Sequence, residues 1–279
     1  MNWLLYKFFD HKSVARAEGF ESDLFSTAHI VFVISIIIIT IIGALVLKNV
    51  NDKKTKLTLR ILSIFMVVFE ATKIIWETYY DLTIGDGVFN TGIIPLYTCS
   101  LFIYTLLIVA WTKKGSMIND ACLSYLTTIN LLAGLIGMIQ CNGLNYYPFW
   151  TFGAFYSLFF HSIMFVTGVT LLTTRYKVLE SKDIIKSWLV FVAFAIIVIP
   201  VNYVLHEDFM QIYSAGGVPY LEDLGTKMAE ANLRPLFTLL MIGLYIIFPS
   251  LIVGVYKLGE SLTKKAPNKK MQEAKSMHH

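Results

Sequence analysis

Charged residues are scarce in this sequence. Aspartate, glutamate, lysine and arginine make up 15% of its 279 residues, whereas a soluble domain carries roughly a quarter. This shortage excludes an ordinary water-soluble domain. The net charge of +4 comes from a few short basic clusters, which we interpret as signals of membrane topology. We therefore expect no nucleic-acid partner.

Cysteine is scarce as well. The sequence has three, Cys99, Cys122 and Cys141, and an odd number without paired spacing argues against a disulfide scaffold. No CxxC motif or cluster of histidine and cysteine indicates a metal site. The sequence therefore predicts neither a metal nor another cofactor.

Apolar residues, in contrast, make up 56% of the chain and fall into long runs. A helix of about 20 residues spans a hydrocarbon core of ~30 Å. The runs predict an all-α, polytopic membrane protein, a bundle of seven transmembrane helices. Their residues are 29–47, 57–80, 92–111, 118–139, 149–173, 184–205 and 235–258.

Lysine and arginine alternate between the predicted loops. The loops after the first, third and fifth runs and the C-terminal segment are basic, whereas residues 81–91 and 140–148 contain no lysine or arginine. The loop 206–234 contains Lys227, with Arg234 at its boundary. Since cytoplasmic loops are enriched in basic residues, we expect an outer N-terminus and a cytoplasmic C-terminus in the cell membrane.

The same pattern divides the chain into three parts. Residues 1–28 are interpreted as an N-terminal interfacial segment, with a partly ordered tail as the alternative. Residues 29–258 form the transmembrane domain, and its long outer loop, 206–234, is expected to cap the outer mouth of the bundle. Residues 259–279 form a basic cytoplasmic tail.

Besides Arg60 near its start, the second run contains three charged residues. Glu70, Lys73 and Glu77 are spaced three and four apart, which places them on one helical face. A charged side chain at mid-membrane costs at least ~2.5–3.5 kcal/mol, so each needs a partner or a purpose. They form either an intrahelical ion-pair ladder or one wall of a polar cavity open to the outside.

A cysteine and a histidine are both placed in the outer half of the membrane. Pro95 suits the first position of a helix, so we expect Cys99 in its first turns, where the helix dipole favours a thiolate. His161, near mid-membrane in the fifth run, could take its proton. The alternatives are a small inert Cys99 in the packing and a histidine bound to Asn130 or to a carbonyl.

Three short segments carry a resemblance to a known family. They are Ile94-Pro95-Leu96-Tyr97-Thr98-Cys99-Ser100, the aromatic run from Phe155 that ends at His161, and Val201-Asn202-Tyr203. The chain resembles the family of transmembrane protein 164 and its bacterial YwaF-type relatives over most of its length. The resemblance implies a membrane acyltransferase that takes an acyl chain from a phospholipid, with Cys99 as nucleophile and His161 as general base. Tyr97 departs from the family, since many relatives have histidine there.

The function predicted from these residues is a lipid acyltransferase or lipid hydrolase. Thr98, Asn202 or Tyr203 could donate to the oxyanion, and the charged residues of the second run would position the headgroup. The Thr98 hydroxyl is the alternative nucleophile to Cys99. The partners would be membrane phospholipids and lysophospholipids, and the oligomeric state stays open. The alternative is a binding or transport protein with an outward-facing polar pocket, for which broken spans and a polar path to the cytoplasm would be evidence.

Overall fold

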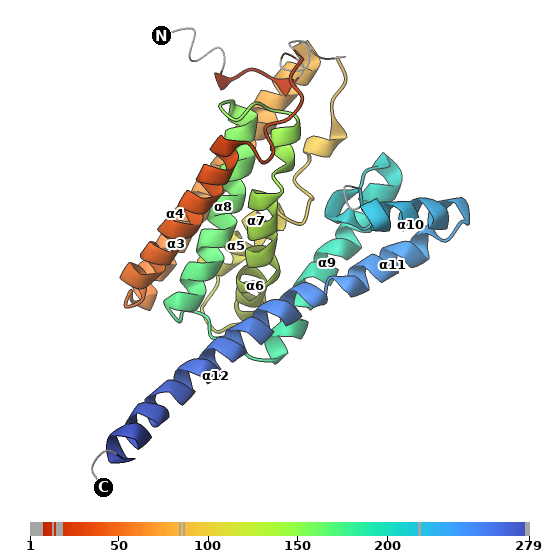
Figure 1. Ribbon diagram of the computed structural model, residues 1–279. Coiled ribbons are helices and arrows are strands. Elements are labelled where there is room, and N and C mark those ends of the chain that lie inside the picture. The colour runs from red at the N-terminus through yellow and green to blue at the C-terminus, as the bar shows by residue number, and fades with distance from the viewer. Residues whose placement is uncertain are drawn as a thin grey trace.

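The computed structural model describes residues 8–12, 14, 19–83, 85, 87–216 and 219–276, with side chains except for Pro219 and residues 263–276. Within these ranges the chain is helical and has no strand. Figure 1 shows the arrangement of the helices. The α-helices are α3 (Thr27–Leu47), α4 (Asp52–Thr83), α5 (Leu101–Trp111), α6 (Met117–Thr127), α7 (Ile129–Ile139), α8 (Phe152–Thr173), α9 (Lys182–Leu205), α10 (Pro219–Glu230), α11 (Arg234–Leu244) and α12 (Ile247–Ser276). Three 3-10 turns complete the list, η1 (Thr91–Ile93), η2 (Asn142–Asn145) and η3 (Phe209–Gln211).

Five helical stretches in the described part of the chain are long and apolar enough to cross a membrane. They are α3, the stretch Met117–Asn145 that contains α6 and α7, α8, α9, and the stretch Arg234–Leu262 that contains α11 and the first half of α12. The protein is therefore a polytopic, all-helical membrane protein. The second and third predicted runs are not among these five stretches. Helix α4 carries charges along its length, and α5 has only 11 residues, or ~16 Å.

The third predicted run is only half helical. We expected a helix over residues 92–111, with Pro95 in its first turn, but the helix begins at Leu101. The residue before a proline avoids the helical region, and Ile94 is extended, with φ −62° and ψ 130°. Tyrosine hydroxyls then satisfy carbonyls of this segment: Tyr104 donates to Pro95 O at 3.1 Å and Tyr125 to Thr98 O at 3.1 Å.

Two other predicted helices are each divided in two. The fourth run breaks at Thr128, where φ −126° and ψ −88° lie outside the helical region. The Thr128 hydroxyl bonds to Ser124 O and to the Ser187 hydroxyl, both at 2.6 Å, and these bonds fix the break against α9. The seventh run breaks between α11 and α12, beside Tyr245. Discontinuous helices at membrane depth occur where they are buried in protein or line a cavity.

Three hydrophobic clusters hold the described helices together, the smallest of them around Leu144 and Leu158. The first joins α4, α5, α6 and α8, and Met66, Phe102 and Met164 within it are fully buried. The second joins α6, α9, α11 and α12 to the loop that follows α9, whose Phe209 is also fully buried. Helix α6 belongs to the first and second clusters and packs on α9.

The loops gather at two ends of the molecule. At one, which we call the basic end, Lys114 pairs with Asp52 at 2.7 Å and Lys177 with Asp120 at 2.6 Å. These contacts join residues 112–116 to the start of α4 and residues 174–181 to α6, and α12 runs past them beyond the bundle (Figure 1). At the opposite end, the Asp23 N–H donates to Leu144 O at 2.9 Å.

The described parts of the N-terminal segment and of the long loop lie at that opposite end. The Trp76 indole on α4 donates to Phe9 O at 3.1 Å, and Lys12 lies 3.2 Å from Glu77, so residues 8–12 pack on α4. Helix α10 packs beside α11. The basic segment 259–276 continues α12 without a break at residue 258.

Candidate functional site

A polar pocket of about 500 Å³ opens near the end opposite the basic loops. Its walls are α4, residues 90–100, the η2 region and α8. We call this cavity the polar pocket. Five of the eight residues predicted for the site line it: Glu70, Lys73, Glu77, Cys99 and His161.

His161 lies on α8 with its ring against α7. The ring fits because residue 137 is glycine: a Cβ there would lie 2.2 Å from His161 Cδ2 and 2.5 Å from Nε2. Its Nδ1 is 2.7 Å from Ser157 O, and since a carbonyl can only accept, Nδ1 carries the proton. Nε2 then keeps its lone pair, as a general base requires. Asn130 instead faces the carbonyls of Leu126 and Met164, each at 3.5 Å.

Cys99 lies on the wall formed by the non-helical segment. It precedes α5 by two residues and is half-buried. The backbone N–H groups of Cys99 and Ser100 are close enough to donate to its sulfur, and α5 begins immediately after them. These two N–H groups precede α5, whose first three N–H groups bond to the carbonyls of Tyr97, Cys99 and Ser100.

The sequence left open whether the charged face of α4 is an intrahelical ion-pair ladder or one wall of a polar cavity. In the structure this face has features of both. Lys73 pairs with Glu77 at 3.3 Å along the helix, and Lys12 pairs with Glu77 at 3.2 Å. Glu70 accepts a hydrogen bond from the Tyr156 hydroxyl of α8. The three residues of α4 are thus partly ion-paired, and they also line the polar pocket.

Three predicted site residues do not line the polar pocket. The amide of Asn202 bonds to the backbone of Phe209, donating to its carbonyl at 2.9 Å and accepting from its N–H at 3.0 Å. The Thr98 hydroxyl lies 3.3 Å from Tyr245 OH. Tyr203 packs edge-on against Tyr213, with ring centroids 5.2 Å apart. Asn202 fixes the loop after α9, and a role of the three at Cys99 stays a prediction.

The region below the pocket is apolar. Met66, Phe102, Phe160 and Met164 are each at most 3% exposed and belong to the first hydrophobic cluster. Phe102 and Phe160 contact edge to face, with centroids 6.0 Å apart. Phe160 also lines the pocket, so this packing adjoins it directly.

Several lining residues were not predicted. On α8, Gly153, Tyr156, Ser157 and Phe160 share the pocket with His161, and their spacing of three and four places all five on one helical face. That spacing is visible in the sequence. Glu207 gave no such signal: it reaches the pocket from the loop after α9 and accepts a hydrogen bond from Thr91.

The arrangement can support nucleophilic chemistry on a bound ester. It offers a thiol, an imidazole with a free Nε2 and backbone N–H donors beside the thiol. Within the described ranges no group of three or more histidine, cysteine, aspartate or glutamate side chains could hold a metal ion. Glu70, Lys73 and Glu77 give the pocket both signs of charge, which suits a zwitterionic group.

Comparisons with known proteins place the chain in a family. No curated protein and no solved structure matches it. The model of the TMEM164 family matches residues 24–255, which covers more than half of the 279 residues and includes every wall of the polar pocket. The chain belongs to the TMEM164 family.

Proposed function

We propose that this protein is a membrane-embedded acyltransferase or hydrolase that acts on the acyl esters of phospholipids. One observation carries the proposal: Cys99 and His161, from separate elements, line the same polar pocket. The resemblance to transmembrane protein 164 and to YwaF-type proteins points to the same pair. Cys99 is the nucleophile, and His161 is the general base.

The reaction runs in two steps. In the first, Nε2 of His161 takes the thiol proton while Cys99 Sγ bonds to the ester carbonyl carbon; the C–O bond then breaks, and the departing lysolipid oxygen takes the proton from Nε2. In the second, the hydroxyl of an acceptor lysolipid, or water, gives its proton to Nε2 and attacks the thioester. The C–S bond breaks, and the thiolate recovers the proton.

The charged groups of α4 bind the headgroup in this proposal. Lys73 faces the phosphate, and Glu70 and Glu77 face the cationic part of a zwitterionic headgroup. The backbone N–H groups of Cys99 and Ser100 replace Thr98, Asn202 and Tyr203 as candidate oxyanion donors, because they lie beside the sulfur.

We further propose that the chain crosses the cell membrane seven times, with its N-terminus outside and its C-terminus in the cytoplasm. The basic end then faces the cytoplasm, and the polar pocket opens to the outer leaflet. In a background without native cysteines, Asn145→Cys and Lys182→Cys probe exposed positions at the two ends. An impermeant maleimide applied to intact cells should label only Asn145→Cys, and labelling of Lys182→Cys alone would reverse the orientation.

A second candidate, lipid or solute transport, is favoured by the broken helices. Residues 94–100 and the breaks in the fourth and seventh runs are the kind of discontinuity that transporters place at their binding sites. The apolar packing of Phe102, Phe160 and their neighbours beside the pocket favours a closed site over a transport path. We therefore rank transport second.

The test is intact-protein mass spectrometry of the full chain after incubation with phospholipid. We expect an added acyl mass that hydroxylamine removes, since hydroxylamine cleaves thioesters. Cys99→Ala should abolish the adduct. His161→Gln should slow its formation by roughly 10²–10⁴-fold, the usual contribution of a general base.

Cys122→Ala is the matched control, because Cys122 is a second buried thiol of the first hydrophobic cluster and does not line the pocket. It should form the adduct as the unmodified protein does. Equal lipid turnover in Cys99→Ala and the unmodified protein would reject the thiol mechanism and favour the transport candidate.

A further inference from the structure

A second cavity lies at the basic end, between the start of α4 and the end of α5. Its volume is also about 500 Å³. We call it the basic pocket, and its lining residues are Asp52, Lys53, Lys56, Leu57, Arg60, Trp111, Thr112, Lys113, Lys114 and Tyr176. Five of these carry a positive charge, and one carries a negative charge.

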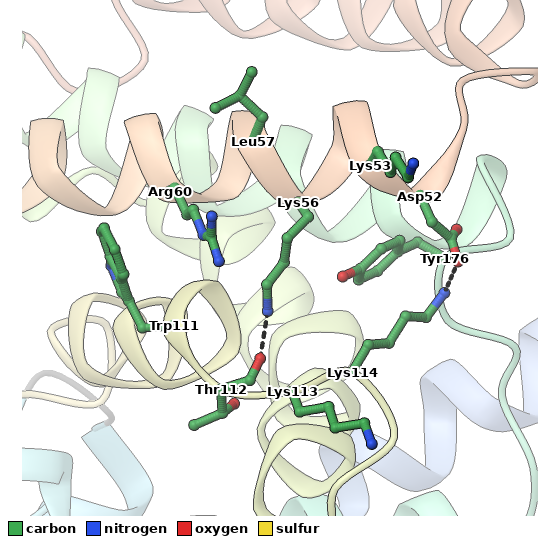
Figure 2. Close-up of a pocket in the computed structure, with 10 residues that line it drawn as sticks. All are labelled: Asp52, Lys53, Lys56, Leu57, Arg60, Trp111, Thr112, Lys113, Lys114 and Tyr176. Atoms are coloured by element: carbon green, nitrogen blue, oxygen red, sulfur yellow. Dashed lines mark hydrogen bonds and ion pairs between the residues drawn. The ribbon is translucent and has the colours of Figure 1, made fainter.

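Two of the cations are held in place by the backbone of α5 and of the residue that follows it. Lys56 donates to Val109 O at 2.6 Å and to Thr112 O at 2.5 Å, and Arg60 Nε donates to Ala110 O at 3.3 Å. Figure 2 shows both side chains pointing from α4 toward the end of α5. An ammonium has three donors and a guanidinium five, so each keeps donors for a ligand.

The other side of the cavity carries an ion pair and a cation–π contact. Lys114 pairs with Asp52 at 2.7 Å and stands over the Tyr176 ring, 3.9 Å from its centroid. Burial, and then the negative charge of Asp52, raises the pKa of the Tyr176 hydroxyl, so this ring stays neutral. Within the described part of the chain, Lys53, Lys113 and the guanidinium of Arg60 have no carboxylate partner.

The cationic cavity borders an exposed apolar surface. On α4, Leu57 is 58% exposed and Ile61 62%, and on α5 Trp111 is 56% exposed. The guanidinium of Arg60 lies over the Trp111 ring, 5.3 Å from its centroid. A binding site for a soluble anion requires only the cations. A binding site for an anionic lipid requires cations beside an apolar surface that can hold the acyl chains.

Membrane topology alone does not require this geometry. The positive-inside rule depends on the number of basic residues near a helix end, and exposed residues such as Lys48 and Lys54 satisfy it at the same end. In the basic pocket, in contrast, cations from α4 and from the segment after α5 face one space, and their mutual repulsion is relieved by an anion.

We propose that the basic pocket binds the phosphate-bearing headgroup of an anionic phospholipid, with the acyl chains lying along Leu57, Ile61 and Trp111. Such pockets between transmembrane helices suit anionic headgroups, and each lysine or arginine near a membrane surface strengthens the attraction. The proposal does not depend on acyl transfer, since the polar pocket lies at the opposite end. A free phosphate compound shares the headgroup chemistry and is the alternative source of the anion.

The experiment measures lipid binding to the purified full-length protein in detergent by native mass spectrometry. Phosphatidylglycerol and phosphatidylcholine are titrated separately against the unmodified protein and the double variant Arg60→Gln/Lys113→Gln. Both substitutions leave the carbonyl bonds of Lys56 in place. The matched control is Lys48→Gln/Lys54→Gln, which removes the same charge from the same end outside the cavity.

We expect phosphatidylglycerol to bind more tightly than phosphatidylcholine. Arg60→Gln/Lys113→Gln should weaken phosphatidylglycerol binding by about fivefold for each cation removed, and the control should leave it unchanged. Equal binding of both lipids, or equal losses in variant and control, would overturn the proposal. Displacement of the lipid by millimolar inorganic phosphate, lost in Arg60→Gln/Lys113→Gln, would assign the pocket to a soluble phosphate compound instead.

Discussion

The imidazole of His161 lies against a part of α7 that has no side chain. Its position depends on Gly137 and on the Ser157 carbonyl, which accepts from Nδ1. Neither residue carries chemistry of its own. Together they set which ring nitrogen keeps its lone pair and where it lies. They therefore determine whether His161 can act as the general base for Cys99.

Gly137→Ala tests this dependence with one added methyl group. A Cβ 2.2 Å from His161 Cδ2 forces the ring to move, and a displacement of about 1 Å can slow a reaction ~100-fold. We expect acyl-adduct formation to slow at least tenfold. The overpacking cost of about 1–3 kcal/mol should exceed the gain of ~1 kcal/mol from replacing a helical glycine, so the midpoint of thermal unfolding should fall.

Gly243→Ala is the control, because a Cβ at that helical position meets nothing within 4 Å. It should leave adduct formation unchanged and should not lower the unfolding midpoint. If Gly137→Ala formed the adduct as fast as Gly243→Ala, the position of the His161 ring would not matter for the reaction.

Among the elements, the segment that carries Cys99 departs most from the sequence prediction. Residues 92–111 form one apolar run, and hydrophobicity alone does not distinguish a full helix from an extended segment followed by α5. The decision rests on partners elsewhere in the chain, above all the hydroxyl of Tyr125, which donates to Thr98 O. A pattern read along one segment cannot supply a donor that lies 27 residues away.

For the site residues, too, a pattern within one segment could be predicted, whereas partners elsewhere in the chain could not. Glu70, Lys73 and Glu77 share a face of α4 by spacing alone, and that spacing placed them correctly beside one another. His161 and Cys99 were paired by depth and by family resemblance, and both line the polar pocket. Asn202 was assigned to the site from a short motif, yet its amide is used within the loop after α9.

At the scale of the whole molecule, the first and second hydrophobic clusters meet between α6 and α9, where polar side chains also bond. Ser124 of α6 donates to Asp183 of α9 at 2.9 Å, and the hydroxyls of Thr128 and Ser187 lie 2.6 Å apart. Lys177, in the loop before α9, pairs with Asp183 at 2.8 Å. Because this interface connects the half that holds the polar pocket to α9, α11 and α12, we expect its polar bonds to help hold the halves together, beside the apolar contacts of Tyr125 and Ile129.

Asp183→Asn tests that interface. The side chains of Asp183 and Lys177 are 1% and 7% exposed, and removing one partner of a buried ion pair leaves an uncompensated charge. We expect a loss of roughly 3 kcal/mol, the lower end for such a change, because Asp120 still faces Lys177 at 2.6 Å. Asp223→Asn is the control: its pair with Lys227 has a similar distance, 2.6 Å, but is 64% and 68% exposed, so its removal should cost at most about 1 kcal/mol. Thermal unfolding in detergent compares the two, and equal midpoints would mean that the buried network does not hold the halves together.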